Sequence, residues 1–216
     1  GGVKTMRLDA FAERFADAGY ACLVFDYRHF GDSDGEPRQL LSVHRQLADY
    51  DAAIEYAKSL DDVDAARIVV WGSSFSGGHA LTLAARQPGL AAAVSQCPFT
   101  SGPASLLALD PISSVKVTGR AVADIASSAL HRDPVLVALT GHGHDAALMT
   151  APDAEPGYLS LVPDGASFTN SVTARAGLAI PFYSPARHMR RIGVPTFVAI
   201  CETDSVAPPG PTIRAA

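Results

Sequence analysis

The sequence lacks the features that would suggest a membrane protein or a nucleic-acid-binding protein. No apolar run reaches the roughly 18 residues that span a bilayer, and no basic segment followed by an apolar leader begins the chain. Lys and Arg number 17 against 22 Asp and Glu, so the net charge of -5 gives no basic surface for nucleic acid or an anionic membrane. Hydrophobic residues make up 48% of the 216 residues and charged residues only 18%. We therefore expect a compact cytoplasmic protein rather than a disordered one.

Cysteine is also scarce. Its three occurrences, Cys22, Cys97 and Cys201, lie inside apolar runs rather than at paired loop positions. This placement predicts buried free thiols and not a disulfide framework. No C-x-x-C pair is present, so a cysteine zinc site is not expected.

The most informative segment is an apolar run that ends at a turn of small residues. Positions 67–78 read Arg-Ile-Val-Val-Trp-Gly-Ser-Ser-Phe-Ser-Gly-Gly. A serine attacks a carbonyl efficiently when a sharp strand-to-helix turn exposes it, and such a turn needs small residues two positions before and after the serine. Gly72 and Ser76 occupy these positions around Ser74, and Gly77 follows. The pattern predicts Ser74 as a nucleophile, with the backbone N–H of Phe75 as an oxyanion donor.

The segment admits three other interpretations. The turn could be a plain connection between a strand and a helix. Ser76 could be the nucleophile, although it would lie deeper in the helix than the strand end at Gly72 suggests. Gly72 and Gly77 have the first spacing of a phosphate-binding loop, but Gly78-His79 stand where Lys and Ser/Thr are needed.

Elsewhere, short apolar runs alternate with helical periodicity. We expect helices at 5–18, 40–60 and 74–86, and buried strands at 21–27, 67–72, 91–97 and 196–201. Strands that follow one another at such short intervals, with helices between them, require crossover connections. The expected fold is therefore a doubly wound, mostly parallel sheet with helices on both faces.

The alternation breaks between Pro98 and Pro195. This interval is too long for a crossover and is rich in Pro, Gly and Ser, so we interpret 99–194 as an inserted cap, with 1–98 and 195–216 as the core. Helical stretches are expected near 113–130 and 171–191. Six apolar cap side chains line an acyl pocket or simply pack the cap: Phe99, Leu106, Leu107, Phe168, Phe182 and Tyr183.

Three segments resemble the α/β-hydrolase superfamily, in its serine esterase, serine aminopeptidase-like or dienelactone hydrolase-like branches. Residues 26–33, D-Y-R-H-F-G-D-S, are similar to the D-Y-R-G-x-G-x-S loop; 72–78 are similar to the nucleophile elbow; and 201–208, C-E-T-D-S-V-A-P, are similar to the G-x-x-D-x-x-x-P turn. The resemblance implies an α/β-hydrolase fold with an inserted, mainly helical cap, and it implies that Asp204 is the triad acid. Without it, Asp204 could equally be a surface residue in a turn before Pro208.

The resemblance also implies a catalytic histidine that residues 1–216 do not contain at the expected place. The family order is Ser, then Asp, then His, yet all seven histidines precede Asp204. We therefore expect a fragment that lacks both ends, with the catalytic histidine beyond residue 216 and one oxyanion donor before Gly1. The first residues, Gly1-Gly2-Val3, resemble the end of the family's H-G-x-G-G loop. Residues 1–216 alone are expected to be inactive.

A pair of histidines lies in the cap, where residues 141–145 read Gly-His-Gly-His-Asp. His142 and His144 could indicate a metal site or a nucleotide-binding turn after the apolar run 134–139. No third ligand is evident, and prolines soon interrupt any following helix. We expect neither a metal nor an organic cofactor.

The sequence thus predicts a serine hydrolase that cleaves a carboxylic ester of a small-molecule acyl substrate through an acyl-enzyme. An amide or peptide substrate is the less favoured version. An acyltransferase or peroxidase-like enzyme uses the same residues, and a non-catalytic scaffold is the third possibility. Neither the substrate nor the oligomeric state follows from the residues.

Overall fold

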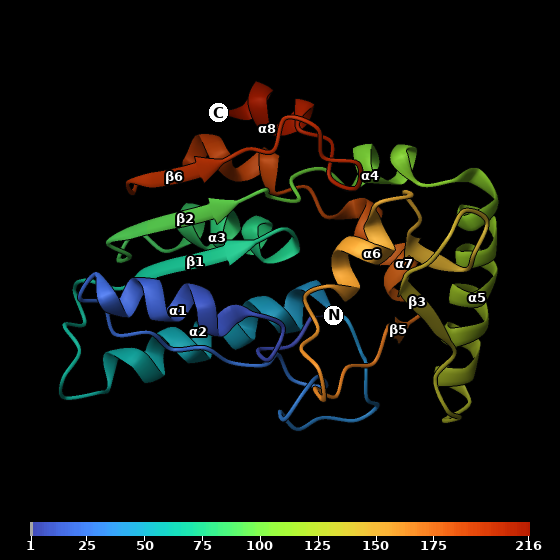
Figure 1. Ribbon diagram of the computed structural model, residues 1–216, viewed down its shortest axis with the longest axis horizontal. Helices are drawn as coiled ribbons and strands as arrows, with labels where there is room; N and C mark the ends of the chain where they lie inside the picture. Colours follow the sequence, from blue (N-terminus) through green and yellow to red (C-terminus); the bar gives the residue numbers. More distant parts are fainter. Residues whose placement is uncertain (1) are drawn as a thin grey trace. The chain divides into compact units, whose positions relative to one another are not determined.

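The computed structural model describes residues 2–216, which form two compact units (Figure 1). The first unit comprises Gly1–Ala53 and Leu109–Leu178, and the second comprises Ile54–Ala108 and Ala179–Ala216. Gly1 lies outside the described residues, as does the start of the loop resemblance assigned to it. The core and cap boundaries at 98 and 195 remain predictions.

The second unit contains a parallel sheet of three strands, ordered β1-β2-β6. The strands are β1 (Val69–Ser73), β2 (Ala92–Gln96) and β6 (Thr196–Ala199), and they lie side by side in Figure 1. Ser73 is in register with Gln96, and Gln96 with Ala199. The predicted strands at 67–72, 91–97 and 196–201 are confirmed, with ends that differ by one or two residues. All three strands end at the same edge of the sheet.

Helix α3 (Phe75–Arg86) connects β1 to β2 and packs against both strands. Its residues 77–84 are all buried, because the helix is covered on its other side by the 3-10 helix η2 (Pro185–Arg191). The remaining elements wholly within this unit are α4 (Gly102–Ala108), the 3-10 helix η1 (Ile180–Phe182) and α8 (Gly210–Ala215). Helix α2 (Val43–Lys58) begins in the first unit and ends in the second.

The first unit contains a smaller mixed sheet, ordered β4-β3-β5. Strand β3 (Leu136–Thr140) pairs in parallel with β4 (Ala147–Met149) and antiparallel with β5 (Ser171–Thr173). The helices are α1 (Leu8–Asp17), α5 (Pro111–Ala129), α6 (Ala154–Leu159) and α7 (Ala176–Ala179). The helices predicted at 5–18 and 113–130 are confirmed. A continuous helical stretch from 171 is wrong, because 171–173 pair as β5.

A buried ion pair fastens the elements of the first unit to one another. The Asp124 side chain on α5 is fully buried and accepts hydrogen bonds from the Arg175 side chain, at 2.6 and 3.0 Å. The same carboxylate accepts the backbone N–H groups of Val135 and Arg175 at 2.9 Å. Four donors compensate the burial of the charge, and they join α5 to the starts of β3 and α7.

The strand predicted at 21–27 is absent from the described residues. The segment has no regular secondary structure and pairs with no described strand, and Tyr20, Leu23 and Val24 are exposed. An apolar run supplies strand propensity, but a strand also needs a neighbouring edge for its backbone hydrogen bonds. Asp26 is buried, and its carboxylate accepts the N–H groups of Lys4 and Asp32 at 2.6 and 3.0 Å.

The prediction of three buried free thiols is wrong. Cys97 and Cys201 form a disulfide, with their Cα atoms 5.4 Å apart, and Cys22 is exposed. The pairing follows from the register, since Cys97 follows β2 and Cys201 lies just beyond its neighbour β6. The sequence separation of 104 positions between the cysteines conceals this proximity. None of the helices in residues 2–216 has the length and apolar character required to cross a membrane.

Candidate active site

Ser74 lies at the apex of the turn between β1 and α3. Its backbone has φ 53° and ψ -118°, in the positive-φ region that residues with side chains rarely adopt, and its side chain is exposed. Three hydrogen bonds hold this conformation: Ser74 N–H donates to Gln96 O at 2.9 Å, and Ser74 O accepts from Phe99 N–H at 2.9 Å and Gly78 N–H at 3.2 Å. A strained and exposed residue fixed by its surroundings is a common feature of catalytic sites.

The small residues around Ser74 are required by close backbone contacts. A Cβ atom added to Gly72 would overlap the Ser76 carbonyl group and would lie 2.9 Å from Gly77 N. A Cβ on Gly77 would lie 3.1 Å from Gln96 O, and one on Gly78 would overlap Phe99 O. Gly72 therefore fills the predicted small position, whereas Ser76 is half-buried and retains a side chain. The requirement for glycine at 78 was not foreseen from the sequence.

Phe75 is the first residue of α3, so its N–H has no acceptor within the helix. The N-terminus of a helix carries partial positive charge, which favours an anion at this position. The N–H next to an exposed Ser74 is therefore suited to hold the oxygen of a carbonyl that the serine attacks.

Asp204 lies in a turn beyond β6 and is half-buried. Its Oδ1 accepts the backbone N–H groups of Val206 and Ala207 at 2.9 and 2.7 Å, which fixes the carboxylate. Because β1 and β6 flank β2 in one parallel sheet, Ser74 and Asp204 both follow the carboxyl ends of strands at the same edge of the sheet. The Cys97–Cys201 disulfide ties the base of this turn to the end of β2.

No histidine completes the pair within the described residues of the second unit. Its two histidines, His79 and His188, make no hydrogen bond with Ser74 or Asp204. His79 is fully buried, its Nδ1 lies 2.8 Å from Tyr183 Oη, and burial lowers its pKa to about 3. His79 is therefore a packing residue of α3.

The histidines of the 141–145 segment pair with carboxylates. His142 Nε2 lies 2.9 Å from Glu155, and His144 Nδ1 lies 3.0 Å from Asp110. In residues 2–216, no group of three or more His, Cys, Asp or Glu side chains could hold a metal ion. The segment connects β3 to β4, so the strand-turn-helix arrangement of a nucleotide-binding turn is not formed.

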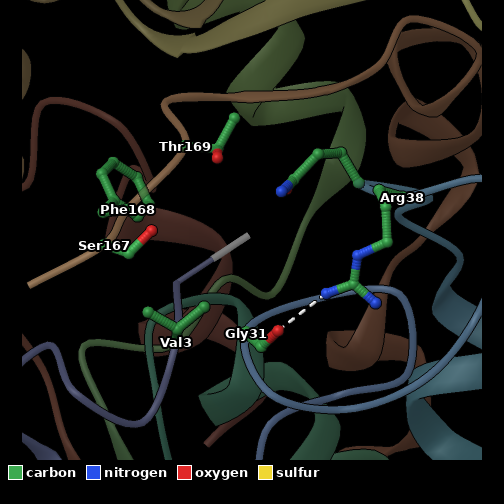
Figure 2. A pocket seen from close by; sticks show the side chains of 7 residues that line it. Val3, Gly31, Arg38, Ser167, Phe168 and Thr169 are labelled. Atoms are coloured by element: carbon green, nitrogen blue, oxygen red, sulfur yellow. Dashed lines mark hydrogen bonds between the residues drawn. The ribbon is translucent and has the colours of Figure 1, made fainter.

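The first unit has a pocket of about 340 Å³ (Figure 2). The Arg38 guanidinium on its wall donates to the carbonyls of Ser33 and Gly31, at 2.6 and 2.8 Å, so it holds the preceding loop. The pocket is lined by Val3, Gly31, Arg38, Gln39, Ser167, Phe168 and Thr169.

Of the six apolar side chains proposed to line an acyl pocket, only Phe168 lies at the first-unit pocket. Leu107 and Phe182 are 88% and 84% exposed. Phe99 and Tyr183 instead pack around the ring of Phe75.

Comparison with known proteins identifies the family. The model of the serine aminopeptidase, S33, family matches residues 2–216. The chain is 53% identical over 214 residues to the quorum-quenching protein AidA of Acinetobacter baumannii (strain MDR-ZJ06), covering 99% of this chain and 70% of AidA. It is 30% identical over 215 residues to the acyltransferase drtE of Aspergillus calidoustus, covering 95% of this chain and 67% of drtE.

A solved structure supports the same conclusion for the fold. The α/β hydrolase GrgF from Penicillium sp. sh18 superposes with a TM-score of 0.81 at 22% identity, over 97% of this chain and 71% of GrgF. The predicted α/β-hydrolase fold is thereby confirmed. The chain is a hydrolase of the serine aminopeptidase, S33, family, within the α/β-hydrolase superfamily.

Proposed function

We propose that the protein is a serine hydrolase that cleaves a carboxylic ester through an acyl-enzyme on Ser74. The observation that carries this proposal is the backbone of Ser74, held at positive φ with an exposed side chain between β1 and α3. Holding a serine in this conformation costs free energy, and the hydroxyl that it exposes is suited to nucleophilic attack.

In this mechanism the Ser74 Oγ attacks the substrate carbonyl carbon, and its proton passes to a general base. The Phe75 N–H donates a hydrogen bond to the resulting oxyanion. Collapse of the tetrahedral intermediate expels the alcohol, which takes up the proton from the base. Water then attacks the acyl-enzyme by the same route and releases the acid. One backbone donor of this kind contributes about 10²- to 10³-fold in kcat.

Asp204 serves in this proposal to orient the base and to stabilise its protonated form. Its fixed turn and its position at the sheet edge that carries Ser74 support that role. The family order places the base after the acid, so a histidine beyond residue 216 remains our prediction. Steady ester turnover by residues 1–216, abolished by Ser74→Ala, would show that the base is internal.

Acyl transfer is a second candidate, because a relative over nearly the whole chain is named an acyltransferase. The two reactions share the acyl-enzyme and differ only in whether water or another nucleophile resolves it. Amide or peptide cleavage is less favoured. A non-catalytic scaffold is also less favoured, because it would not require the strained backbone at Ser74.

We expect a small-molecule acyl substrate and no partner nucleic acid or membrane. No cofactor enters the proposed steps, because the serine, backbone donor and base suffice for acyl transfer. A cytoplasmic location also remains a prediction. The Cys97–Cys201 disulfide counts against it, since such bonds are rare in reducing compartments.

The test uses the full-length protein with p-nitrophenyl butyrate. Ser74→Ala is expected to remove at least 10³-fold of kcat, whereas Ser76→Ala, the matched change two residues later, should retain activity within a few-fold. A butyryl adduct that maps to Ser74 after rapid acid quenching identifies the acyl-enzyme, and added methanol reports acyl transfer through methyl butyrate. Retention of turnover in Ser74→Ala with its loss in Ser76→Ala would overturn the assignment.

A further inference from the structure

The peptide between Ser74 and Phe75 contains both the Ser74 carbonyl and the Phe75 N–H. A peptide group is planar, so the direction of its carbonyl fixes the direction of its N–H. The carbonyl accepts hydrogen bonds from Phe99 N–H at 2.9 Å and Gly78 N–H at 3.2 Å. The orientation of the proposed oxyanion donor is therefore set by the groups that hold the opposite side of the same peptide.

The side chain of Phe75 lies in a cluster of rings. Its centroid is 5.0 Å from that of His79, 5.1 Å from Phe99 and 5.5 Å from Tyr183, each in an edge-on arrangement. Tyr183 also stacks on Phe99 at 6.1 Å. Tyr183 therefore contacts Phe75, which carries the donor N–H, and Phe99, which is one of the two residues whose N–H groups hold the Ser74 carbonyl.

Hydrogen bonds in turn fix the hydroxyl of Tyr183. Tyr183 Oη lies 2.8 Å from His79 Nδ1 and 3.1 Å from Thr82 Oγ1. Thr82 Oγ1 donates its one proton to Gly78 O at 2.9 Å, so it accepts from Tyr183. Tyr183 has then used its own proton, and His79 Nδ1–H must donate to it. The hydrogen bonds therefore run from His79 through Tyr183 and Thr82 to the carbonyl of Gly78, so that both ends of the chain lie on α3.

The backbone of Tyr183 is held as firmly as its side chain. Its carbonyl accepts Gly102 N–H at 2.8 Å, and its N–H donates to Ile180 O at 2.9 Å. The added Cβ of any other residue at 102 would overlap the carbonyl of Ile180. The ring therefore projects from a fixed backbone, which allows it to hold the neighbouring rings in place.

We propose that Tyr183 is a positioning residue for the oxyanion donor. Its ring and its hydroxyl bond to His79 hold Phe75 and Phe99 so that the Phe75 N–H points at the oxygen of the transition state. This inference deepens the proposed function and rests on it. The sequence marked Tyr183 only as a possible pocket-lining or cap-packing residue, and it gave no sign of a role towards the oxyanion donor.

The experiment compares Tyr183→Phe with wild type in the full-length protein. The variant keeps the ring and loses the hydroxyl, and Tyr56→Phe, at a residue 57% exposed on α2, is the matched control. Competent sites are counted with a fluorophosphonate, so that kcat for p-nitrophenyl butyrate is expressed per labelled Ser74. Affinity for a trifluoromethyl ketone, which forms an oxyanion adduct with the serine, is measured in parallel.

For Tyr183→Phe we expect kcat per labelled site to fall about tenfold, which is part of the 10²- to 10³-fold effect of losing an oxyanion donor. KM should change less than twofold, and ketone affinity should fall by the same factor as kcat. Tyr56→Phe should match wild type. A purely structural tyrosine would instead lower the labelled fraction and leave kcat per site unchanged, which would overturn the inference.

A second pair of variants changes His79, the partner of Tyr183 in the hydrogen bond between Nδ1 and Oη. His79→Asn places an N–H near the former Nδ1, whereas His79→Leu removes it. We expect kcat per site to decrease from wild type to His79→Asn to His79→Leu, and equal values for the two variants would contradict the inference.

If wild type shows neither Ser74 labelling nor turnover, the proposed function fails and the inference with it. Normal labelling with an unaffected Tyr183→Phe overturns the inference alone.

Discussion

Gly72→Ala tests whether the turn geometry at Ser74 is as tight as the structure indicates. The added Cβ would lie closer than the 3.0 Å that real Cβ atoms essentially never violate, and the atoms that it meets are the backbone of Ser76 and Gly77 rather than a flexible side chain. Relief therefore requires the first turn of α3 to move, by about 1 Å. A displacement of about 1 Å at a catalytic group can cost around 10²-fold in rate.

The expected result for Gly72→Ala is a loss of about 10²-fold in kcat/KM for p-nitrophenyl butyrate. Overpacking should also destabilise the fold by about 3 kcal/mol. At this chain length that corresponds to a fall of roughly 6–12 °C in Tm. Gly89→Ala is the control, because a Cβ at Gly89 meets no atom within 4 Å. Activity of Gly72→Ala within threefold of wild type, at unchanged Tm, would refute the reasoning.

Three further predictions concern stability and covalent structure. Arg175→Ala leaves the buried Asp124 carboxylate without its main partner, so urea unfolding should show that the free energy of unfolding falls by about 3–5 kcal/mol. Arg187→Ala, at an exposed position, should change it very little, and equal losses in the two variants would contradict the prediction. Burial lowers the pKa of His79 to about 3, so at mildly acidic pH the unfolded chain binds a proton at this residue more readily than the folded chain does. The free energy of unfolding should therefore fall as the pH decreases from 6.5 towards 3, by up to about 1.4 kcal/mol per pH unit. If His79→Asn shows the same pH dependence of stability as wild type, the prediction is contradicted. Thiol titration in denaturant should find one thiol, Cys22, before reduction and three afterwards; three at the outset would refute the disulfide.

The sequence predicted those helices, strands and turns whose formation depends on residues close together in the chain. Helical periodicity located α1, α2 and α5 to within a few residues, and the change from apolar run to small residues located β1 and the turn at Ser74. The requirement for glycine at 72 could be foreseen because it arises from the turn itself. The positive φ of Ser74 is a second consequence of the same tight turn.

Contacts between distant positions were not predictable in this way. The Cys97–Cys201 disulfide and the His79–Tyr183 bond each join residues more than 100 positions apart, and only the sheet register and the packing of α3 bring them together. Strands β4 and β5 were missed because each is only three residues long, and the apolar run at 134–139, which contains most of β3, was not assigned to a sheet. One signal for His79 was available, since it lies four residues after Phe75 and therefore on the same face of the helix.

The central claim is that Ser74 is the nucleophile, and covalent labelling tests it most directly. The full-length protein is treated with a fluorophosphonate, digested and mapped by mass spectrometry, alongside Ser74→Ala and Ser76→Ala. We predict a single stoichiometric adduct on Ser74 in wild type and in Ser76→Ala, and none in Ser74→Ala. An adduct on Ser76, or labelling that persists in Ser74→Ala, would contradict the claim.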